Sequence, residues 1–213
     1  MKTEPLQVKR SGDFYYPIYF EEGFGSLADA IRTEGLDSRK MCIVSDTNVA
    51  PLYADSLKSA LSSVASSISL FVFEAGEKSK HLHTVQNLYE KLIESELDRN
   101  SLIVALGGGV VGDLAGFSAA TYLRGIDFIQ VPTTLLAQVD SSVGGKTGVD
   151  FNQYKNMVGA FHQPRLVYMN LQTLKSLPDT QFACGMGEVL KTGLICDGDF
   201  YHFVCEHQKT IQN

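Results

Sequence analysis

The sequence has no tryptophan and few cysteines, and these absences exclude several classes of protein. The four cysteines are widely spaced and form no C-x-x-C pair, so neither a zinc knuckle nor a disulfide framework is indicated. The first ten residues carry no apolar segment of the kind that a signal peptide needs. No window approaches the ~18 uninterrupted apolar residues of a membrane span. We therefore expect a reduced, cytoplasmic protein.

Positive charge is also scarce. The 18 Lys and Arg residues stand against 24 Asp and Glu residues, which gives a formal net charge of −6. This balance argues against nucleic-acid binding but leaves room for a local basic pocket that takes an anionic small molecule. Hydrophobic residues make up 44% and charged residues 20% of the chain, which is an ordinary globular composition. The length of 213 residues suggests one large domain, or one domain with part of another.

Short β-rich runs alternate with helical patterns over most of the chain. Strands are expected at residues 15–20, 40–46, 68–73, 101–106, 127–131 and 165–169, and helices at 26–35, 48–64, 83–97 and 110–121. This alternation predicts βαβ units and a mostly parallel sheet, and hence an α/β fold. On the helix 83–97 the spacing predicts that Val85, Leu88, Leu92 and Ile93 share one apolar face.

The pattern changes in "LKSLPD" (174–179), where Pro178 interrupts it. Residues 180–195 and 197–211 have the pattern of helices, and no strand is expected after them. We therefore predict a domain boundary near residue 176, with an α/β domain at 1–176 and the first helices of an all-helical domain at 177–213. Because this second segment is too short for an independent core, that domain is expected to be incomplete.

Polar or glycine-rich segments follow four of the expected strands, at 45–48, 74–80, 107–113 and 132–146. Ligands of parallel sheets bind beyond the carboxyl ends of the strands, so these segments predict a binding site. In "LGGGVVGDLAG", Gly107, Gly109 and Gly112 match the dinucleotide pattern G-x-G-x-x-G. That pattern also needs an acidic residue at the end of the next strand, whereas Asp127 has the spacing but opens its strand.

The register of the three glycines is therefore interpreted as accidental. Consecutive glycines before a helix still favour a pyrophosphate cradle, because the helix N-terminus offers free N–H groups. The alternative is that the glycines only permit tight packing of strand and helix.

Two further segments combine charge with small residues. "VDSSVGGKTGVD" (139–150) holds Asp140 and Lys146 around a Gly-Gly pair, which suits either a loop around an anionic or polyhydroxylated ligand or a solvated loop. Glu188 and Lys191 lie at i, i+3 on a predicted helix, as a surface ion pair or as a metal-binding carboxylate beside a substrate-binding lysine. The five histidines form no convincing metal pair and are interpreted as structural or surface residues.

Together these segments resemble the 3-dehydroquinate synthases, sugar-phosphate cyclases of the shikimate pathway. The matching segments are "SDTNVA", "GEKSK", "ALGGGVVGDLAGFSAATYLRGI", "VPTTLLAQVDSSVGGKTGVD", "YKNMVGAFHQP" and "GEVLKTGLI". They cover essentially the whole chain, and "PTTLLAQVDSSVGGKTGV" is far more specific than the glycine triplet. The resemblance implies a Rossmann-like NAD-binding domain followed by an all-helical domain, with the active site in the cleft between them.

The resemblance also implies roles for residues at matching positions. Cofactor contacts are implied for Asp46, Asn48, Glu77, Lys80, Gly108, Gly109, Val110, Asp113, Thr133, Thr134, Lys146, Lys155 and Thr173. Substrate contacts or catalysis are implied for Arg124, Asp140, Lys146, Asn156 and Lys191, with Arg124 reaching across a homodimer. Glu188 matches a ligand of the zinc (or cobalt) ion, whose two histidine ligands in the family lie beyond residue 213.

The implied reaction converts 3-deoxy-D-arabino-heptulosonate 7-phosphate to 3-dehydroquinate and phosphate, which makes the enzyme a carbon–oxygen lyase. NAD is reduced and reoxidised within each turnover. We expect this chain by itself to bind NAD weakly and not to turn over substrate. Two alternatives stay open: a related sugar-phosphate cyclase or glycerol-dehydrogenase-like metal-dependent alcohol dehydrogenase, and a non-enzymatic NAD-binding or interaction module.

Overall fold

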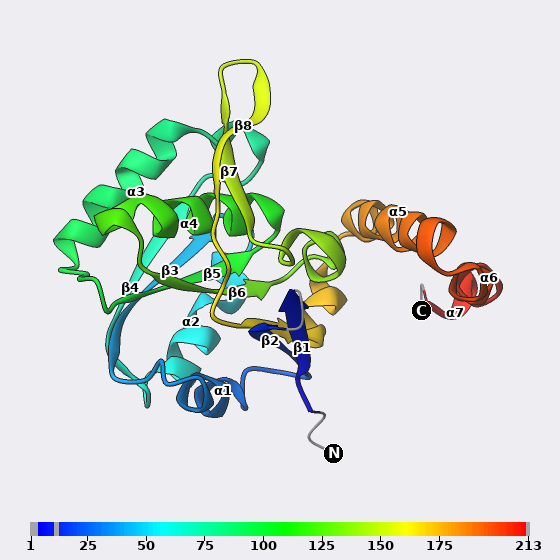
Figure 1. Cartoon of the computed structure of the whole chain (residues 1–213), viewed down its shortest axis with the longest axis horizontal. Coiled ribbons are helices and arrows are strands. Elements are labelled where there is room, and N and C mark those ends of the chain that lie inside the picture. Colours follow the sequence, from blue (N-terminus) through cyan, green and yellow to red (C-terminus); the bar gives the residue numbers. More distant parts are fainter. Residues whose placement is uncertain (1–3, 11–12, 212–213) are drawn as a thin grey trace.

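A seven-stranded sheet forms the centre of the molecule in the computed structural model, which describes residues 4–10 and 13–211 (Figure 1). Its strands are β1 (Leu6–Arg10), β2 (Asp13–Glu21), β3 (Arg39–Asp46), β4 (Ala65–Phe73), β5 (Leu102–Gly107), β6 (Asp127–Pro132) and β9 (Val167–Asn170). Their spatial order is β1-β2-β9-β6-β5-β3-β4, and β1 alone pairs antiparallel. The predicted α/β fold with a mostly parallel sheet is confirmed.

Helices cover both faces of the sheet, with α1 (Leu27–Thr33) and α2 (Ala50–Leu61) on one face and α3 (Leu82–Glu94) and α4 (Gly109–Thr121) on the other (Figure 1). Side chains of β3 alternate between these layers. Met41 and Ile43 pack in the core under α1 and α2, whereas Cys42 and Val44 pack under α3 and α4. Because both faces are buried, the strand is a continuous apolar run instead of an alternating one.

The predicted apolar face of α3 is confirmed except at one residue. Val85, Leu88 and Leu92 are buried, but the side chain of Ile93 is 65% exposed. Ile93 lies about 80° around the helix from Val85, which carries it past the edge of the buried stripe.

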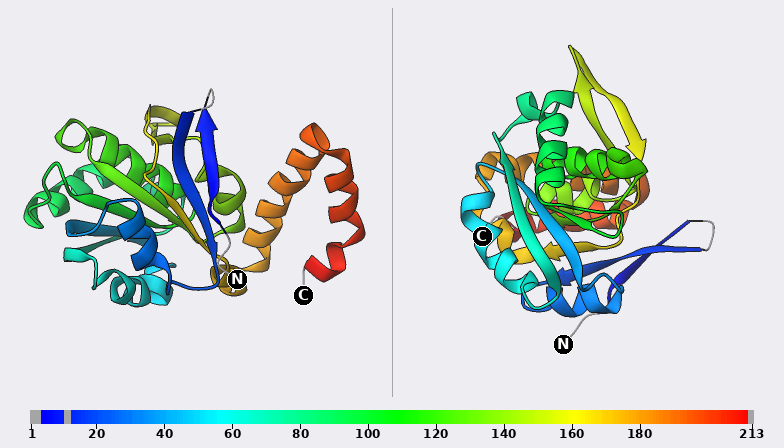
Figure 2. Two further views of the ribbon diagram at one scale, coloured as in Figure 1. Left: turned by 60° about the horizontal axis from the view of Figure 1, so that its bottom comes forward. Right: turned by 90° about the vertical axis from the view of Figure 1, so that its left-hand side faces the viewer.

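A β-hairpin made of β7 (Lys146–Phe151) and β8 (Tyr154–Phe161) stands out beside α4 (Figures 1 and 2). A loop was expected over 139–150, but only residues 142–145 form one, between the π-helical η3 (Ala137–Ser141) and β7. Gly148 and Gly159 are paired across the hairpin, and a Cβ on Gly148 would lie 2.7 Å from the carbonyl oxygen of Val158. These glycines allow the close pairing and also weaken the strand signal in the sequence.

Beyond β9 the described residues are helical or irregular: η4 (Leu171–Ser176), α5 (Asp179–Cys196), α6 (Gly198–Glu206) and α7 (Gln208–Ile211). The two predicted helical regions are confirmed, and they form an arm that leaves the sheet (Figure 2). The arm packs closely at Gly185 against the residues just before η3, since a Cβ there would lie 2.6 Å from Leu135 Cβ.

The division into two domains stays a prediction, and its outermost residues, 1–3 and 212–213, lie outside the described residues. Across residues 4–10 and 13–211, no helix combines the length and apolar character needed to cross a membrane.

Candidate functional site

The loops after β3, β4, β5 and β6 line one cavity of about 790 Å³, called here the strand-end cavity. Strands β3 and β5 are neighbours in the sheet. From β3 the chain continues to β4 on one side, and from β5 it continues to β6 on the other side. Such a change in direction opens a crevice at the carboxyl ends of the strands. The predicted cofactor residues that line it are Asp46, Asn48, Glu77, Lys80, Gly108, Gly109, Val110, Asp113, Thr133, Thr134 and Thr173. Residues of all four polar strand ends therefore lie on the wall of one cavity.

The glycines of this loop have two different roles, because two of them pack against neighbouring side chains and two line the strand-end cavity. Gly107 has the side chain of Val111 where its Cβ would be, and a Cβ on Gly112 would lie 2.5 Å from Gln130 Oε1. These two glycines therefore let α4 pack closely on the sheet. Gly108 and Gly109 instead form the N-terminus of α4 at the cavity, facing Thr134 and Ser141. Free N–H groups at a helix N-terminus suit a phosphate group.

An unpaired hydroxyl supports the same conclusion. Thr133 Oγ1 is buried and has no hydrogen-bond partner among the described residues, although Thr133 lies on the cavity wall. A buried hydroxyl without a partner costs roughly 1–3 kcal/mol, so a ligand that supplies a partner would gain affinity. The open backbone at Gly108 and Gly109 and this free hydroxyl both fit a dinucleotide.

Lys80 connects the strand-end cavity to the hairpin. It follows η1 (Glu77–Ser79), and its Nζ donates to Asp113 Oδ2 and to Asn156 Oδ1, both at 2.6 Å. The backbone closes a ring, because Asp150 N donates to Lys80 O (2.8 Å) and Asn156 N donates to Asp150 Oδ1 (2.7 Å). An ammonium group only donates, so it fixes Asn156 with its oxygen toward Lys80 and leaves the amide NH₂ to donate to another acceptor.

Burial raises the pKa of Asp113, and the neighbouring Lys80 ammonium opposes this increase. The ion pair is largely shielded from water, since the side chains of Lys80 and Asp113 are 6% and 21% exposed. A charge that is this buried is stable only with a partner.

A second cavity of about 520 Å³, called here the hairpin cavity, adjoins the first. Both cavities are lined by Asp113, Asp140 and Ser141. Lys146 and Asn156 also line the hairpin cavity, so the fold brings three predicted substrate residues (Asp140, Lys146 and Asn156) to one place.

Lys146 and Lys155 do not line the strand-end cavity, although cofactor contacts were predicted for both. Lys155 instead forms an exposed ion pair with Glu77 (3.4 Å). Ser141 and Asp150 were not among the predicted site residues. The one signal for Ser141 is its place beside Asp140 in "VDSSVGGK", and Asp150 becomes relevant only through the hairpin geometry.

Helix α5 adds a charged pair to this region. Lys191 forms an ion pair with Glu188, which raises the pKa of the lysine. Burial opposes this increase, and the negative charge of Asp140 adds a smaller increase. Lys191 therefore lies within electrostatic reach of Asp140. Within the described residues no group of three or more His, Cys, Asp or Glu side chains is placed to hold a metal ion. Glu188 alone is one of the four ligands that zinc usually takes, so this region does not form a complete metal centre.

Arg124, like Lys191, lines neither cavity in its own chain. It ends η2 (Tyr122–Arg124), is exposed, and follows the C-terminal end of α4. The strand-end cavity lies at the other end of this 13-residue helix, a distance of about 20 Å along its axis.

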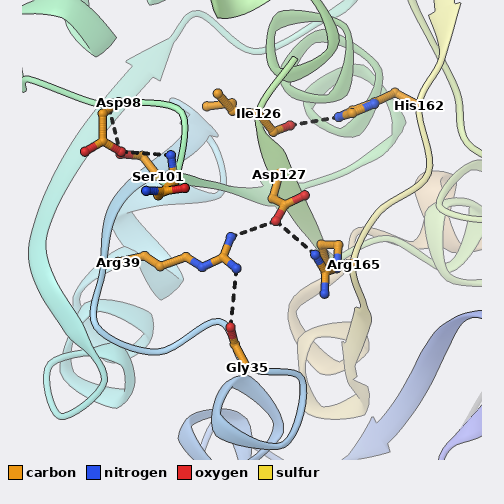
Figure 3. Close-up of polar contacts among 9 residues, drawn as sticks. Gly35, Arg39, Asp98, Ser101, Ile126, Asp127, His162 and Arg165 are labelled. Atoms are coloured by element: carbon orange, nitrogen blue, oxygen red, sulfur yellow. Dashed lines mark hydrogen bonds and ion pairs between the residues drawn. The ribbon is translucent and has the colours of Figure 1, made fainter.

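Asp127 lies at the amino ends of the strands, away from the cavities. Figure 3 shows its carboxylate accepting hydrogen bonds from Arg39 (2.7 Å) and Arg165 (3.1 Å). Its spacing from Gly107 is therefore unrelated to a nucleotide, as its place at the start of β6 predicted.

The model of one protein family, described as 3-dehydroquinate synthase N-terminal, matches residues 70–184. The chain belongs to the 3-dehydroquinate synthase family. It is 53% identical over 194 residues to the 3-dehydroquinate synthase of Symbiobacterium thermophilum, covering 91% of this chain and 54% of the relative. With that of Acetivibrio thermocellus it shares 48% identity over 201 residues, covering 94% and 56%. The chain spans about half the length of the curated relatives that it matches.

Solved structures of related enzymes have the same fold. A 2-deoxy-scyllo-inosose synthase complexed with carbaglucose-6-phosphate, NAD⁺ and Co²⁺ superimposes with a TM-score of 0.81 at 31% identity, over 89% of this chain and 52% of that one. The 2-epi-5-epi-valiolone synthase of Streptomyces hygroscopicus, with NAD⁺ and Zn²⁺ bound, gives 0.83 at 26% identity, over 97% and 57%. The glycerol dehydrogenase of Schizosaccharomyces pombe gives 0.61 at 17% identity over 82% and 42%, which shows the fold alone.

Proposed function

We propose that this chain forms the cofactor site and much of the substrate site of a 3-dehydroquinate synthase, which converts 3-deoxy-D-arabino-heptulosonate 7-phosphate to 3-dehydroquinate and phosphate. The observation that carries the proposal is the pair of adjoining cavities with Asp113, Asp140 and Ser141 in common. A cofactor and a substrate bound in them would lie side by side, as hydride transfer requires. The family and its named relatives support this reaction over that of an alcohol dehydrogenase.

The strand-end cavity is the proposed site of NAD. Its pyrophosphate would lie at the N-terminus of α4, on the backbone of Gly109 and Val110, with Thr133 as a hydroxyl partner. Asp46 has one carboxylate oxygen occupied by the N–H groups of Asn48 and Val49 (2.9 Å each), which leaves the other for the ligand. Bound NAD would supply a reversible hydride acceptor.

The hairpin cavity is the proposed substrate site. The Lys146 ammonium would neutralise an anionic group, and the free NH₂ of Asn156 would donate to a substrate oxygen. Asp140 is placed to orient a hydroxyl and to take its proton, while Lys191 stays protonated because Glu188 and Asp140 raise its pKa. Glu188 is the proposed contribution of this region to a divalent metal site, and we derive no step through the metal.

Three further features belong to the proposal. The enzyme acts as a homodimer in the cytoplasm, with Arg124 of one subunit reaching the site of the other. Residues 1–176 and 177–213 belong to different domains. This chain by itself binds NAD without turnover, since the described residues supply one candidate metal ligand.

A pair of threonine variants tests the cofactor site. In Thr133→Val the unpaired hydroxyl is removed, so we expect an unchanged or higher unfolding temperature but an NAD affinity about fivefold to tenfold lower. In Thr147→Val the hydrogen bond to Ala160 O (2.8 Å) is lost, so we expect about 1 kcal/mol lower stability with NAD affinity unchanged. Calorimetric titration with NAD and thermal unfolding measure the two effects.

The opposite results would contradict the proposal. If the native chain does not bind NAD, or if both variants lower its affinity equally, the strand-end cavity is not the cofactor site. NADH that accumulates when the chain is given NAD and glycerol would favour a dehydrogenase.

A further inference from the structure

Two glycines link the segment that carries Asp140 to the strand that begins at Lys146. Gly144 and Gly145 both have left-handed backbone conformations, with φ of 94° and 67°, and they join η3 to β7. Asp140 precedes them, and Lys146 follows them directly. The relative position of these two charged groups therefore depends on how firmly the Gly-Gly link is held, because glycine restricts the backbone less than any other residue.

Three hydrogen bonds hold this link from outside. The N–H of Gly144 donates to the hydroxyl oxygen of Tyr16 (3.1 Å), and Gln163 Nε2 donates to Gly144 O (3.1 Å). The backbone N–H of His162 donates to Gly145 O (2.8 Å). The His162 ring in turn contacts Ile126 O at 2.9 Å (Figure 3).

Of these three partners, Tyr16 is the farthest from the link in the sequence and the most deeply buried. It lies on β2, is 0% exposed, and packs in a small core with Ile18, Val167 and Met169. A fully buried side chain does not touch a ligand in either cavity. Its hydroxyl is also polar and buried, which is favourable only because it has a partner in the link.

We propose that Tyr16 is a positioning residue of the active site: its hydroxyl fixes the Gly144 peptide and thereby sets Lys146 relative to Asp140. The inference rests on the proposed function for the identity of the ligand, but not for the contact itself. It links the N-terminal hairpin of β1 and β2 to the hairpin cavity. Most of the strand-end cavity does not depend on this contact, because apart from Asp140 and Ser141 its lining residues come from other loops.

Tyr16→Phe tests the proposal, with Tyr19→Phe as a matched control. Tyr19 lies on the same strand and donates through its hydroxyl to Glu34 (3.0 Å), away from the link. We expect Tyr16→Phe to speed hydrogen exchange of the Gly144 amide by at least about tenfold. Affinity for the heptulosonate 7-phosphate, measured calorimetrically in the presence of NAD, should fall about fivefold to tenfold, with NAD affinity unchanged. In Tyr19→Phe none of the three should change.

The outcomes separate this inference from the proposed function. If the native chain does not bind the sugar phosphate, the proposed substrate site fails, but the exchange measurement still tests the contact. An unchanged Gly144 exchange rate in Tyr16→Phe overturns the inference, as does an equal loss of NAD and sugar-phosphate affinity. If Tyr16→Phe does not fold, Gln163→Leu removes another hydrogen bond to Gly144 and should give the same selective loss.

Discussion

At the scale of single residues, Lys80 is notable because its charged ammonium group is buried at the strand-end cavity. It is buried and paired with Asp113, whose pKa is raised by burial and held down by the lysine. Replacement by Lys80→Met removes the cation and keeps most of the apolar stem, so we expect the pKa of Asp113 to rise by at least about one pH unit. Carbon-13 NMR titration of the carboxyl groups would measure it directly.

Lys78→Met is the control, since Lys78 is an exposed lysine on the same turn. The sign of the pH effect on stability follows from the raised pKa. The folded protein binds this proton more tightly than the unfolded chain, so the stabilising contribution is present below pH 3.8, the ordinary carboxyl value, and is lost as pH rises through the folded pKa. This loss should be larger in Lys80→Met. An Asp113 pKa that is unchanged or lower in that variant would show that the two groups do not interact.

The sequence was enough to predict which residues lie near the strand-end cavity, but not which side chains contact each other there. Gly108, Gly109, Thr133 and Thr134 were recognisable because they follow strands whose carboxyl ends must meet. The contact of Lys80 with Asn156 could not be predicted, since it depends on a hairpin that brings together residues 76 positions apart. For the same reason Tyr16 gave no signal, because its partner Gly144 lies 128 residues away.

At the scale of the elements, α4 begins in the glycine loop and packs on its neighbours through glycines. A Cβ on Gly116 would overlap Thr147 Cγ2 and lie 3.1 Å from the Phe128 ring. We expect Gly116→Ala to destabilise the protein by about 1–3 kcal/mol through overpacking. Gly187→Ala on α5, where a Cβ would meet nothing within 4 Å, should be neutral or stabilising by up to about 1 kcal/mol. Urea unfolding measures both changes.

A second substitution checks the cause. Thr147→Ser removes Cγ2 but keeps the hydroxyl that donates to Ala160 O. Combined with Gly116→Ala it should recover part of the lost stability, because the overlapping methyl group is gone. If the double variant is as unstable as the sum of the single ones, the loss does not come from this contact.

The strands and helices of the central layers could be predicted because both core faces impose a strong apolar pattern. The hairpin of β7 and β8 could not, because it stands outside the sheet with glycines and charged residues along it. Apolar residues also occupy both faces of β8, since Met157 and Phe161 are 67% and 83% exposed while Val158 and Ala160 pack against the core. Strand β1, which pairs only at the edge of the sheet, was missed as well.

At the scale of the whole molecule, the proposed dimer rests on the position of Arg124 outside both cavities of its own chain. Arg124 is exposed at the far end of α4, while the hairpin cavity is bordered by the exposed Met157 and Phe161. A twofold interface that joins this apolar rim to the Arg124 end of α4 would bring each Arg124 to the partner's cavity, because such interfaces are reciprocal. The proposal therefore requires that each site contain residues of both subunits.

A mixed dimer of two variants tests this requirement. Arg124→Ala and Lys146→Ala should each bind the heptulosonate 7-phosphate at least about tenfold more weakly than the native chain, because each loses a cation that pairs with an anionic group. In a heterodimer purified through two different tags, the Arg124→Ala subunit keeps its own Lys146 and receives Arg124 from its partner. One site per dimer should then bind with native affinity in a calorimetric titration. If Arg124 serves its own subunit, neither site is complete and the heterodimer binds no better than the parent variants. Sedimentation velocity on the same samples confirms that a dimer is present, so that a negative result counts against Arg124 and not against assembly.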